Sequence, residues 1–206
     1  MASKSINDTE TPISRLRDWG KASGLDIKRR QQASRAWFRT KAAQLRVNRM
    51  TLFRERDRYV TQFTEDDIGR MFFYDYDAKT KEQLKYWDAA PIIFLTSVTK
   101  DGHTGLNLHY LSLFQRAMFM DELHKIKTDR KYNKDTKLKL TYGLLKNASK
   151  LQMFKPCFKR YLTSHIKSPI IRVEAEEWDS AAFLPMAKWQ KATESQVHRD
   201  SMRSTL

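Results

Sequence analysis

Residues 69–116 read GRMFFYDYDAKTKEQLKYWDAAPIIFLTSVTKDGHTGLNLHYLSLFQR, and this stretch predicts the β-structure of the chain. Residues 71–76 are short and aromatic, and residues 91–98 form the most apolar segment, rich in β-branched side chains. Residues 100–105 contain an Asp-Gly pair and a second glycine, a strong signal for a hairpin turn. Residues 106–110 then alternate apolar and polar, as in a half-buried return strand. We therefore expect an antiparallel meander of about three strands as the folding core.

The sequence outside this meander indicates helices. After Tyr110 the apolar period changes from two to about 3.6, which predicts a helix over residues 113–125 and a further helical segment over 138–151. Residues 169–175 read as a closing strand that could join the first sheet. We expect an α+β fold: a small antiparallel β-sheet, for which an SH3-like barrel is one arrangement, packed by helices. The expected division is an N-terminal basic helical arm over 1–64 and a compact domain over 65–206.

The prediction of a helical arm rests on residues 27–59. These residues contain neither glycine nor proline and are rich in arginine, alanine and glutamine. This composition predicts one long basic N-terminal helix. Residues 28–58 hold eleven basic and two acidic side chains, and nine of the basic ones are arginines. Glu55 and Asp57 are the acidic pair, so most of these arginines lack a partner within the helix.

The charge of the whole chain points to a polyanionic partner. The 206 residues carry a formal net charge of +15, and 40% are hydrophobic, which is enough for a packed core. A second basic block covers residues 110–168, with fourteen basic against four acidic side chains. The single cysteine excludes an intramolecular disulfide and a cysteine-based zinc site. No apolar run is long enough to cross a membrane, so we expect no membrane partner. The sequence has no glycine-rich phosphate-binding loop, and we expect no cofactor.

Nucleic acid is the commonest polyanion, and the forked guanidinium group of arginine suits phosphate oxygens. The candidate DNA-binding residues are the cations of the two basic blocks: Arg29, Arg30, Arg35, Arg39, Lys41, Arg46, Arg54, Arg58, Lys131, Lys155, Lys159 and Arg160. In residues 153–162 aromatic side chains alternate with lysines, a pattern that can stack bases or grip a backbone. The same pattern also fits aromatic side chains buried in the core, with the lysines on the solvent-exposed face. The basic helix likewise also fits contact with an acidic protein.

Two residue groups invite a catalytic interpretation. Asp75, Asp77, Glu82 and Asp88 bring four carboxylates close in sequence, as in a metal-dependent nuclease. No Glu-x-Lys pair follows on a neighbouring strand, so an exposed hairpin tip is the favoured interpretation. His103, Asn107 and His109 are spaced too tightly for a ββ-metal-helix nuclease. We therefore expect no catalytic residue and no metal site.

Four blocks of the sequence resemble a known family. Residues 69–74 (GRMFFY), 77–81 (DAKTK), 84–91 (LKYWDAAP) and above all 105–111 (GLNLHYL) are similar to DNA end protectors, or head-completion proteins, of T-even-like tailed bacteriophages. The resemblance implies a non-enzymatic virion protein that covers the ends of packaged linear double-stranded DNA and contacts other virion proteins. It also implies a location in the virion, and in the host cytoplasm during assembly. Backbone contacts would carry such binding, with little base specificity.

Three hypotheses follow. The first is a DNA-binding virion protein; the second is a structural neck, tail or baseplate component whose basic helix docks on protein; the third is a metal-dependent nuclease. Under the first, reversing Arg35, Arg39 and Arg46 to glutamate weakens DNA binding and leaves the thermal midpoint nearly unchanged.

Overall fold

The central strand β2 (Met71–Phe73) explains why its segment reads as a run of large apolar residues. The structure is a computed structural model that describes residues 29, 32 and 59–203. Met71 and Phe73 belong to the core under one face of the sheet, whereas Phe72 and Tyr74 belong to a second core on the other face. Successive side chains of a strand point to opposite faces, and here both faces are covered, so no polar alternation is left in the sequence.

Six strands form the main sheet in the order β1-β7-β2-β4-β5-β6, and every neighbouring pair is antiparallel. β4 (Ile92–Thr99) and β5 (Gly102–Asn107) form the predicted hairpin. The outer strands are β1 (Tyr59–Val60), β7 (Ile170–Val173) and β6 (Phe158–Leu162). β1 brings residues on the N-terminal side of residue 65 into the sheet.

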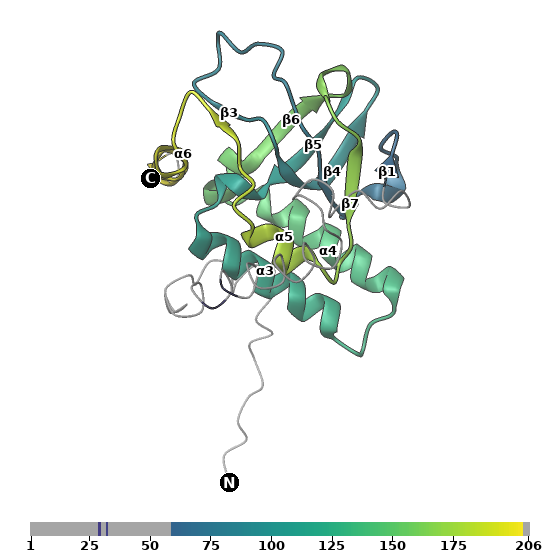
Figure 1. Ribbon diagram of the computed structural model, residues 1–206. Helices are drawn as coiled ribbons and strands as arrows, with labels where there is room; N and C mark the ends of the chain where they lie inside the picture. The colour runs from purple at the N-terminus through teal and green to yellow at the C-terminus, as the bar shows by residue number, and fades with distance from the viewer. Residues whose placement is uncertain (1–28, 30–31, 33–58, 204–206) are drawn as a thin grey trace.

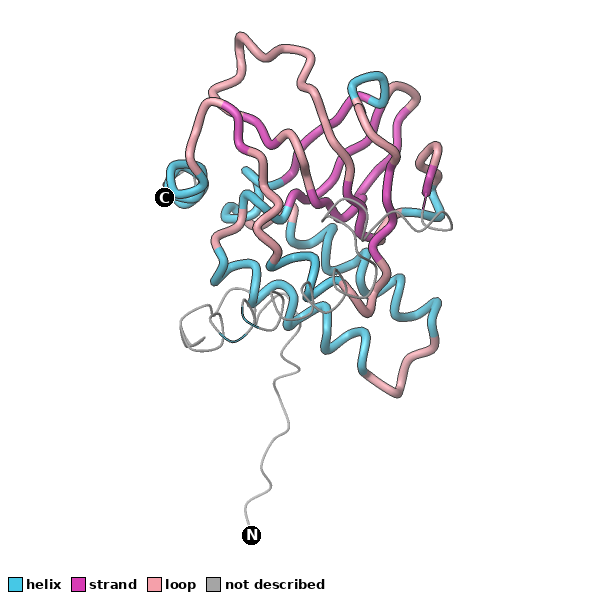
Figure 2. Tube along the Cα trace, in the orientation of Figure 1, coloured by secondary structure: helices cyan, strands magenta, loops and turns pink. Residues whose placement is uncertain are grey.

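Three helices cover one face of this sheet (Figure 1). They are α3 (Leu113–Thr128), α4 (Lys134–Ala148) and α5 (Trp178–Phe183), and Figure 2 shows them as a cyan layer beneath the magenta strands. Ser112 and Gln115 form a capping box at the start of α3, and the Asn133 side chain caps α4. The larger core lies between these helices and the sheet.

The C-terminal part of the chain returns to the meander. β3 (Trp87–Asp88) pairs with β8 (Trp189–Gln190) in a separate two-stranded sheet. The last helix, α6 (Glu194–Arg203), follows β8 in the chain and is seen at the left of Figure 1. Short 3-10 helices η3 (Glu65–Asp67), η4 (Leu108–Tyr110), η5 (Gln152–Cys157) and η6 (Thr163–His165) complete the described part of the chain.

The α+β class with a mostly antiparallel sheet is confirmed, as are the helix from residue 113 and the closing strand at 170. An SH3-like barrel is not confirmed by this strand order. The expected return strand over 106–110 was wrong in its bounds: β5 already starts at Gly102 and ends at Asn107. There the Asn107 side chain accepts a hydrogen bond from the His109 backbone N–H, which turns the chain into η4.

The long N-terminal helix stays a prediction for most of its length. Arg29 and Gln32 are helical and exposed, and Tyr59, its expected last residue, lies in β1. The remaining residues of 27–59 lie outside the described part of the chain.

Candidate functional site

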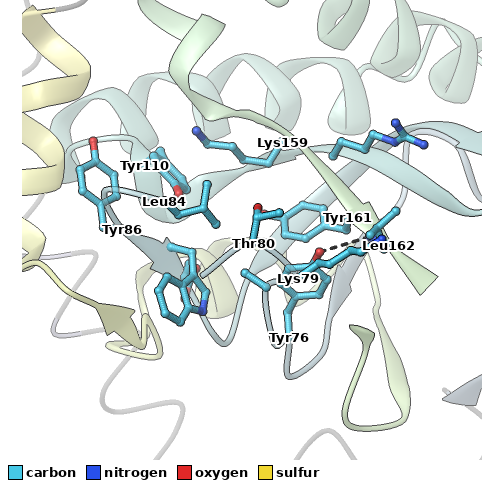
Figure 3. A pocket seen from close by; sticks show the side chains of 13 residues that line it. Tyr76, Lys79, Thr80, Leu84, Tyr86, Tyr110, Lys159, Tyr161 and Leu162 are labelled. Atoms are coloured by element: carbon cyan, nitrogen blue, oxygen red, sulfur yellow. Dashed lines mark hydrogen bonds between the residues drawn. The ribbon is translucent and has the colours of Figure 1, made fainter. Parts of the chain in front are cut away.

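A pocket of about 300 Å³ opens beside the β3–β8 sheet and β6 (Figure 3). Five aromatic rings line it, from Tyr76, Tyr86, Trp87, Tyr110 and Tyr161. Three cationic side chains also line it, from Lys79, Lys159 and Arg160, and Asp88 is its one carboxylate. Ala78, Thr80, Leu84 and Leu162 complete the wall. An aromatic pocket with a positive lining suits an anionic ligand that contains a ring.

Residues from distant parts of the chain meet in this pocket. Lys159 and Tyr161 lie two residues apart on β6 and therefore share one face of that strand. Tyr110 ends η4, and Trp87 begins β3. Tyr76 is held by an isolated bridge to the segment after β6, and its hydroxyl accepts a hydrogen bond from the Leu162 backbone N–H, as Figure 3 shows.

Edge-to-face packing fixes the aromatic walls. The rings of Tyr76 and Tyr161 lie 4.9 Å apart at an interplanar angle of 89°. Tyr110 and Tyr86 both pack edge-to-face on Trp189, with centroids 4.8 Å and 6.1 Å from it. Such contacts leave little rotational freedom to the rings, so the pocket is preformed rather than created by a ligand.

Lys159 is the least hydrated cation of the pocket. Its ammonium lies 4.3 Å from the centroid of the Tyr110 ring, and Figure 3 shows the side chain extended along the pocket toward that ring. Burial lowers the pKa of Lys159, an effect that Cys157 partly opposes. Within the described part of the chain Lys159 contacts no carboxylate, so its charge is balanced only by the face of a tyrosine ring.

Asp88 forms the structural hub beneath the pocket and is only 2% exposed. Its Oδ2 accepts hydrogen bonds from His109 Nδ1 at 2.6 Å and from Asn107 Nδ2 at 3.1 Å. Its Oδ1 accepts from the backbone N–H groups of Ala90 and Lys188. Burial alone would raise the pKa of the Asp88 carboxyl, but the attraction of His109 and these hydrogen bonds together lower it. The hub ties β3, β5, η4 and the segment before β8 into one unit.

His103 supports the pocket from behind. Its Nε2 shares a 2.6 Å hydrogen bond with the Tyr74 hydroxyl, and its ring stacks on Tyr161 with centroids 5.4 Å apart. Burial lowers the pKa of His103 to about 4. Tyr161 in turn accepts a hydrogen bond from Asn107, so His103 and the Asp88 hub hold the same pocket wall.

The acidic residues considered for a metal site are separated by their contacts. Asp75 pairs with Lys188 at 3.2 Å, and Asp77 pairs with Lys81 at 2.7 Å. The Lys81 hydrogen bond lowers the pKa of Asp77. Among the residues that the structure describes, no group of three or more histidine, cysteine, aspartate or glutamate side chains could hold a metal ion. The nuclease hypothesis therefore gains no support from this region.

The predicted DNA-binding residues divide into three sets. Lys159 and Arg160 line the pocket, although Arg160 Nη2 also donates to both carboxylate oxygens of Asp101, at 2.7 and 2.8 Å. Lys131, in the α3–α4 connection, and Lys155, in η5, are exposed and are not part of the pocket. Arg29 is exposed in its helix, and the other seven lie outside the described residues: Arg30, Arg35, Arg39, Lys41, Arg46, Arg54 and Arg58.

A second basic surface follows α4. Lys139, Tyr142 and Lys146 are three and four residues apart, which places them on one helix face, and all three are exposed. Lys150 is exposed just beyond the helix end. In the part of the chain that the structure describes, none of these lysines contacts a carboxylate. We call Lys139, Lys146 and Lys150 the α4 lysine face.

Reasoning from the sequence missed most of the pocket. Lys79 and the five aromatic rings are spread from residue 76 to residue 161, and no local pattern links them. The aromatic–lysine alternation of residues 153–162 was the one available signal, and it includes Lys159 and Tyr161.

Comparison with known proteins gives a family assignment. The family model described as "Phage T4 terminal DNA protecting protein" matches residues 23–201, which is most of the chain. Searches of curated proteins and of solved structures found no significant match. The match spans all the described strands and both basic blocks. On this evidence the chain belongs to the family of phage T4 terminal DNA protecting proteins.

Proposed function

We propose that this protein binds the ends of packaged linear double-stranded DNA through their phosphates, protects them from exonucleases and completes the phage head. The observation that carries the proposal is the family match over residues 23–201, because the name of the family states protection of terminal DNA. The protein acts without catalysis: it covers the end and so keeps an exonuclease from reaching it.

The distribution of charge supports contact with the DNA backbone. The net charge of +15 supplies a long-range attraction to a polyanion. The α4 lysine face presents cations that no described carboxylate neutralises, and Lys131 and Lys155 add exposed charge. The arginine-rich segment 28–58 extends this basic character toward the N-terminus. Phosphate contacts position a protein on DNA without reading sequence, which suits protection of an end whatever its bases.

The proposed location is the virion, and the host cytoplasm during assembly, with other virion proteins as further partners. None of the helices in the described part of the chain is long and apolar enough to cross a lipid bilayer. Purified protein should co-sediment with DNA-filled heads and should not do so with empty ones.

An exonuclease-protection assay tests the core of the proposal. Linear duplex DNA is incubated with the protein over a salt series and then digested, with the surviving length as readout. Protection should fall steeply with salt: about six phosphate contacts would cost on the order of a thousandfold in affinity between 50 and 200 mM salt.

Two sets of substitutions in the α4 lysine face test whether its positive charge is what binds DNA. Replacing Lys139, Lys146 and Lys150 together by glutamate should abolish most of the protection and flatten the salt dependence. Replacing the same three by arginine keeps their charge and should preserve protection. Full protection by the glutamate variant would remove the α4 lysine face from the DNA interface. Absence of protection by the unmodified protein at low salt would refute the function itself.

The alternative of a structural neck, tail or baseplate component rests on the basic helix, most of which lies outside the described residues. That function predicts indifference to DNA in the same assay. The family name favours the DNA-end function.

A further inference from the structure

We propose that the aromatic pocket between β3, η4 and β6 binds the unpaired terminal nucleotide of a DNA end, with its base among the rings and its 5′-phosphate at Lys159. This inference rests on the proposed function, and it adds the site at which an end is told apart from continuous duplex.

The size and the walls of the pocket fit one nucleotide. A volume of about 300 Å³ lies at the lower end of ligand pockets, which span about 300–1,000 Å³. Tyr86 and Tyr110 form one side, Tyr76 and Tyr161 form another, and Trp87 also lines the pocket. Stacking on aromatic rings tolerates every base, because each base has a π-face. The pocket can therefore bind an end without sequence preference.

Lys159 supplies the anion-binding group. A cation that has lost much of its water and has no carboxylate partner gains more from a phosphate than a fully hydrated surface lysine does. The Tyr110 ring holds the ammonium at the pocket rather than in bulk solvent. Tyr110 itself lines the pocket, so a phosphate bound by Lys159 would lie beside this ring.

The remaining charges favour an anion as well. Lys79 also lines the pocket, and Lys191 lies 5.7 Å from the Trp87 ring; Arg160, in the lining as well, is already paired with Asp101. The single lining carboxylate, Asp88, accepts four hydrogen bonds, one of them from His109, so it has no capacity left for a cation. A cationic or neutral peptide would leave Lys159 unpaired, whereas a nucleotide pairs it.

Moving a terminal nucleotide into such a pocket costs less free energy than moving an internal one. An internal base must break its pair and lose stacking on both sides before it can leave the duplex, whereas a terminal base stacks on one side only. The aromatic walls bind the unpaired base, and Lys159 binds the terminal phosphate. In an internal nucleotide that phosphate is esterified to the neighbouring nucleotide. Both features make the pocket specific for ends.

The test compares three DNAs of equal length. One duplex has an unpaired 5′-terminal nucleotide with a 5′-phosphate, the second has a 5′-hydroxyl there, and the third is closed at both ends by hairpin loops. We expect the full-length protein to prefer the phosphorylated end over the closed duplex by about tenfold or more, with the hydroxyl form between them. Lys159→Met keeps the length of the side chain and should erase the difference between phosphate and hydroxyl. Tyr86→Leu should weaken binding to the open end by about 5- to 100-fold.

The control is Lys100→Met, which removes an exposed lysine of the β4–β5 turn that does not line the pocket. It should keep the ratio between open and closed DNA. Thermal midpoints show whether each variant is folded. As a second measurement, deoxyadenosine 5′-monophosphate is titrated against the protein with tryptophan fluorescence as readout. We expect quenching that Trp87→Phe removes.

The outcomes distinguish the two proposals. If the protein prefers open ends but Lys159→Met and Tyr86→Leu, both folded, keep that preference, then the pocket assignment is overturned and end protection stands. If the unmodified protein binds open and closed duplexes equally and gives no exonuclease protection, both proposals fail. Loss of the phosphate discrimination in Lys159→Met, with the ratio intact in Lys100→Met, establishes the pocket as the end site.

Discussion

Protonation of His103 should destabilise this protein in mild acid, because the structure has no place for the charged ring. His103 is fully buried among Phe63, Tyr74 and Tyr161. Its Nε2 bonds to the Tyr74 hydroxyl, whereas its Nδ1 has no partner. A protonated imidazole carries an N–H on both nitrogens, so it would leave one donor and a charge unsatisfied in the core.

The size of the effect follows from the pKa difference. Burial lowers the pKa of His103 from 6.5 to about 4. Between these values the unfolded chain binds the proton more tightly than the folded protein, so the free energy of unfolding falls as pH falls through this window. A difference of about 2.5 pKa units corresponds to about 3 kcal/mol, of which about 2.5 kcal/mol is lost by pH 4.5. Above pH 6.5 the contribution is constant.

Urea unfolding at pH 7 and at pH 4.5 measures this loss, and His103→Gln identifies its source. Glutamine does not titrate, so its variant should lose about 2.5 kcal/mol less than the unmodified protein over the same interval. The comparison is needed because burial also lowers the pKa of His198, so His198 too lowers the free energy of unfolding as the pH falls. The lowered pKa of Asp88 costs stability only below about pH 3.9, outside the interval. An equal pH dependence in the two proteins would refute the reasoning.

Four further substitutions test the packing and the buried charges. A Cβ on Gly102 would lie 2.1 Å from the Tyr161 carbonyl oxygen, so Gly102→Ala should force β5 from β6 and cost about 3 kcal/mol in chemical unfolding; Gly143→Ala, with nothing within 4 Å, should be neutral or stabilise by up to about 1 kcal/mol. Arg116 is 2% exposed and donates to the carbonyls of Leu111 and Ala182, so Arg116→Met should lower the free energy of unfolding by roughly 2–4 kcal/mol, and an unchanged value would show that these bonds contribute nothing. Asp88→Asn removes the charge that faces His109 and should cost about 3–5 kcal/mol, measured at pH 7; a loss under about 1 kcal/mol would contradict the role of Asp88 as the hub.

The elements that depend on local chemistry were predictable. β4 and β5 follow from the apolar run at 92–95 and from the turn at Asp101-Gly102. The helix from residue 113 follows from its apolar period and from Ser112 as its cap. β6 was missed because Phe154, Phe158 and Tyr161 are spaced four and three residues apart, as on one face of a helix, although residues 158–162 form a strand. β8 is two residues long and exists only because β3 is there to pair with it.

By itself, the sequence determined the charge of this protein, its antiparallel hairpin and its family likeness, because each of these is set by residues that are neighbours in the chain. Only the tertiary structure decided which cation is desolvated and which rings surround it. Lys159 meets Tyr110 across 49 positions of sequence, and Asp88 joins His109 and Asn107 by contacts that no local pattern specifies. Burial and the loss of a counter-charge are properties of the packed chain, so the pocket and its chemistry appear only when β3, η4 and β6 come together.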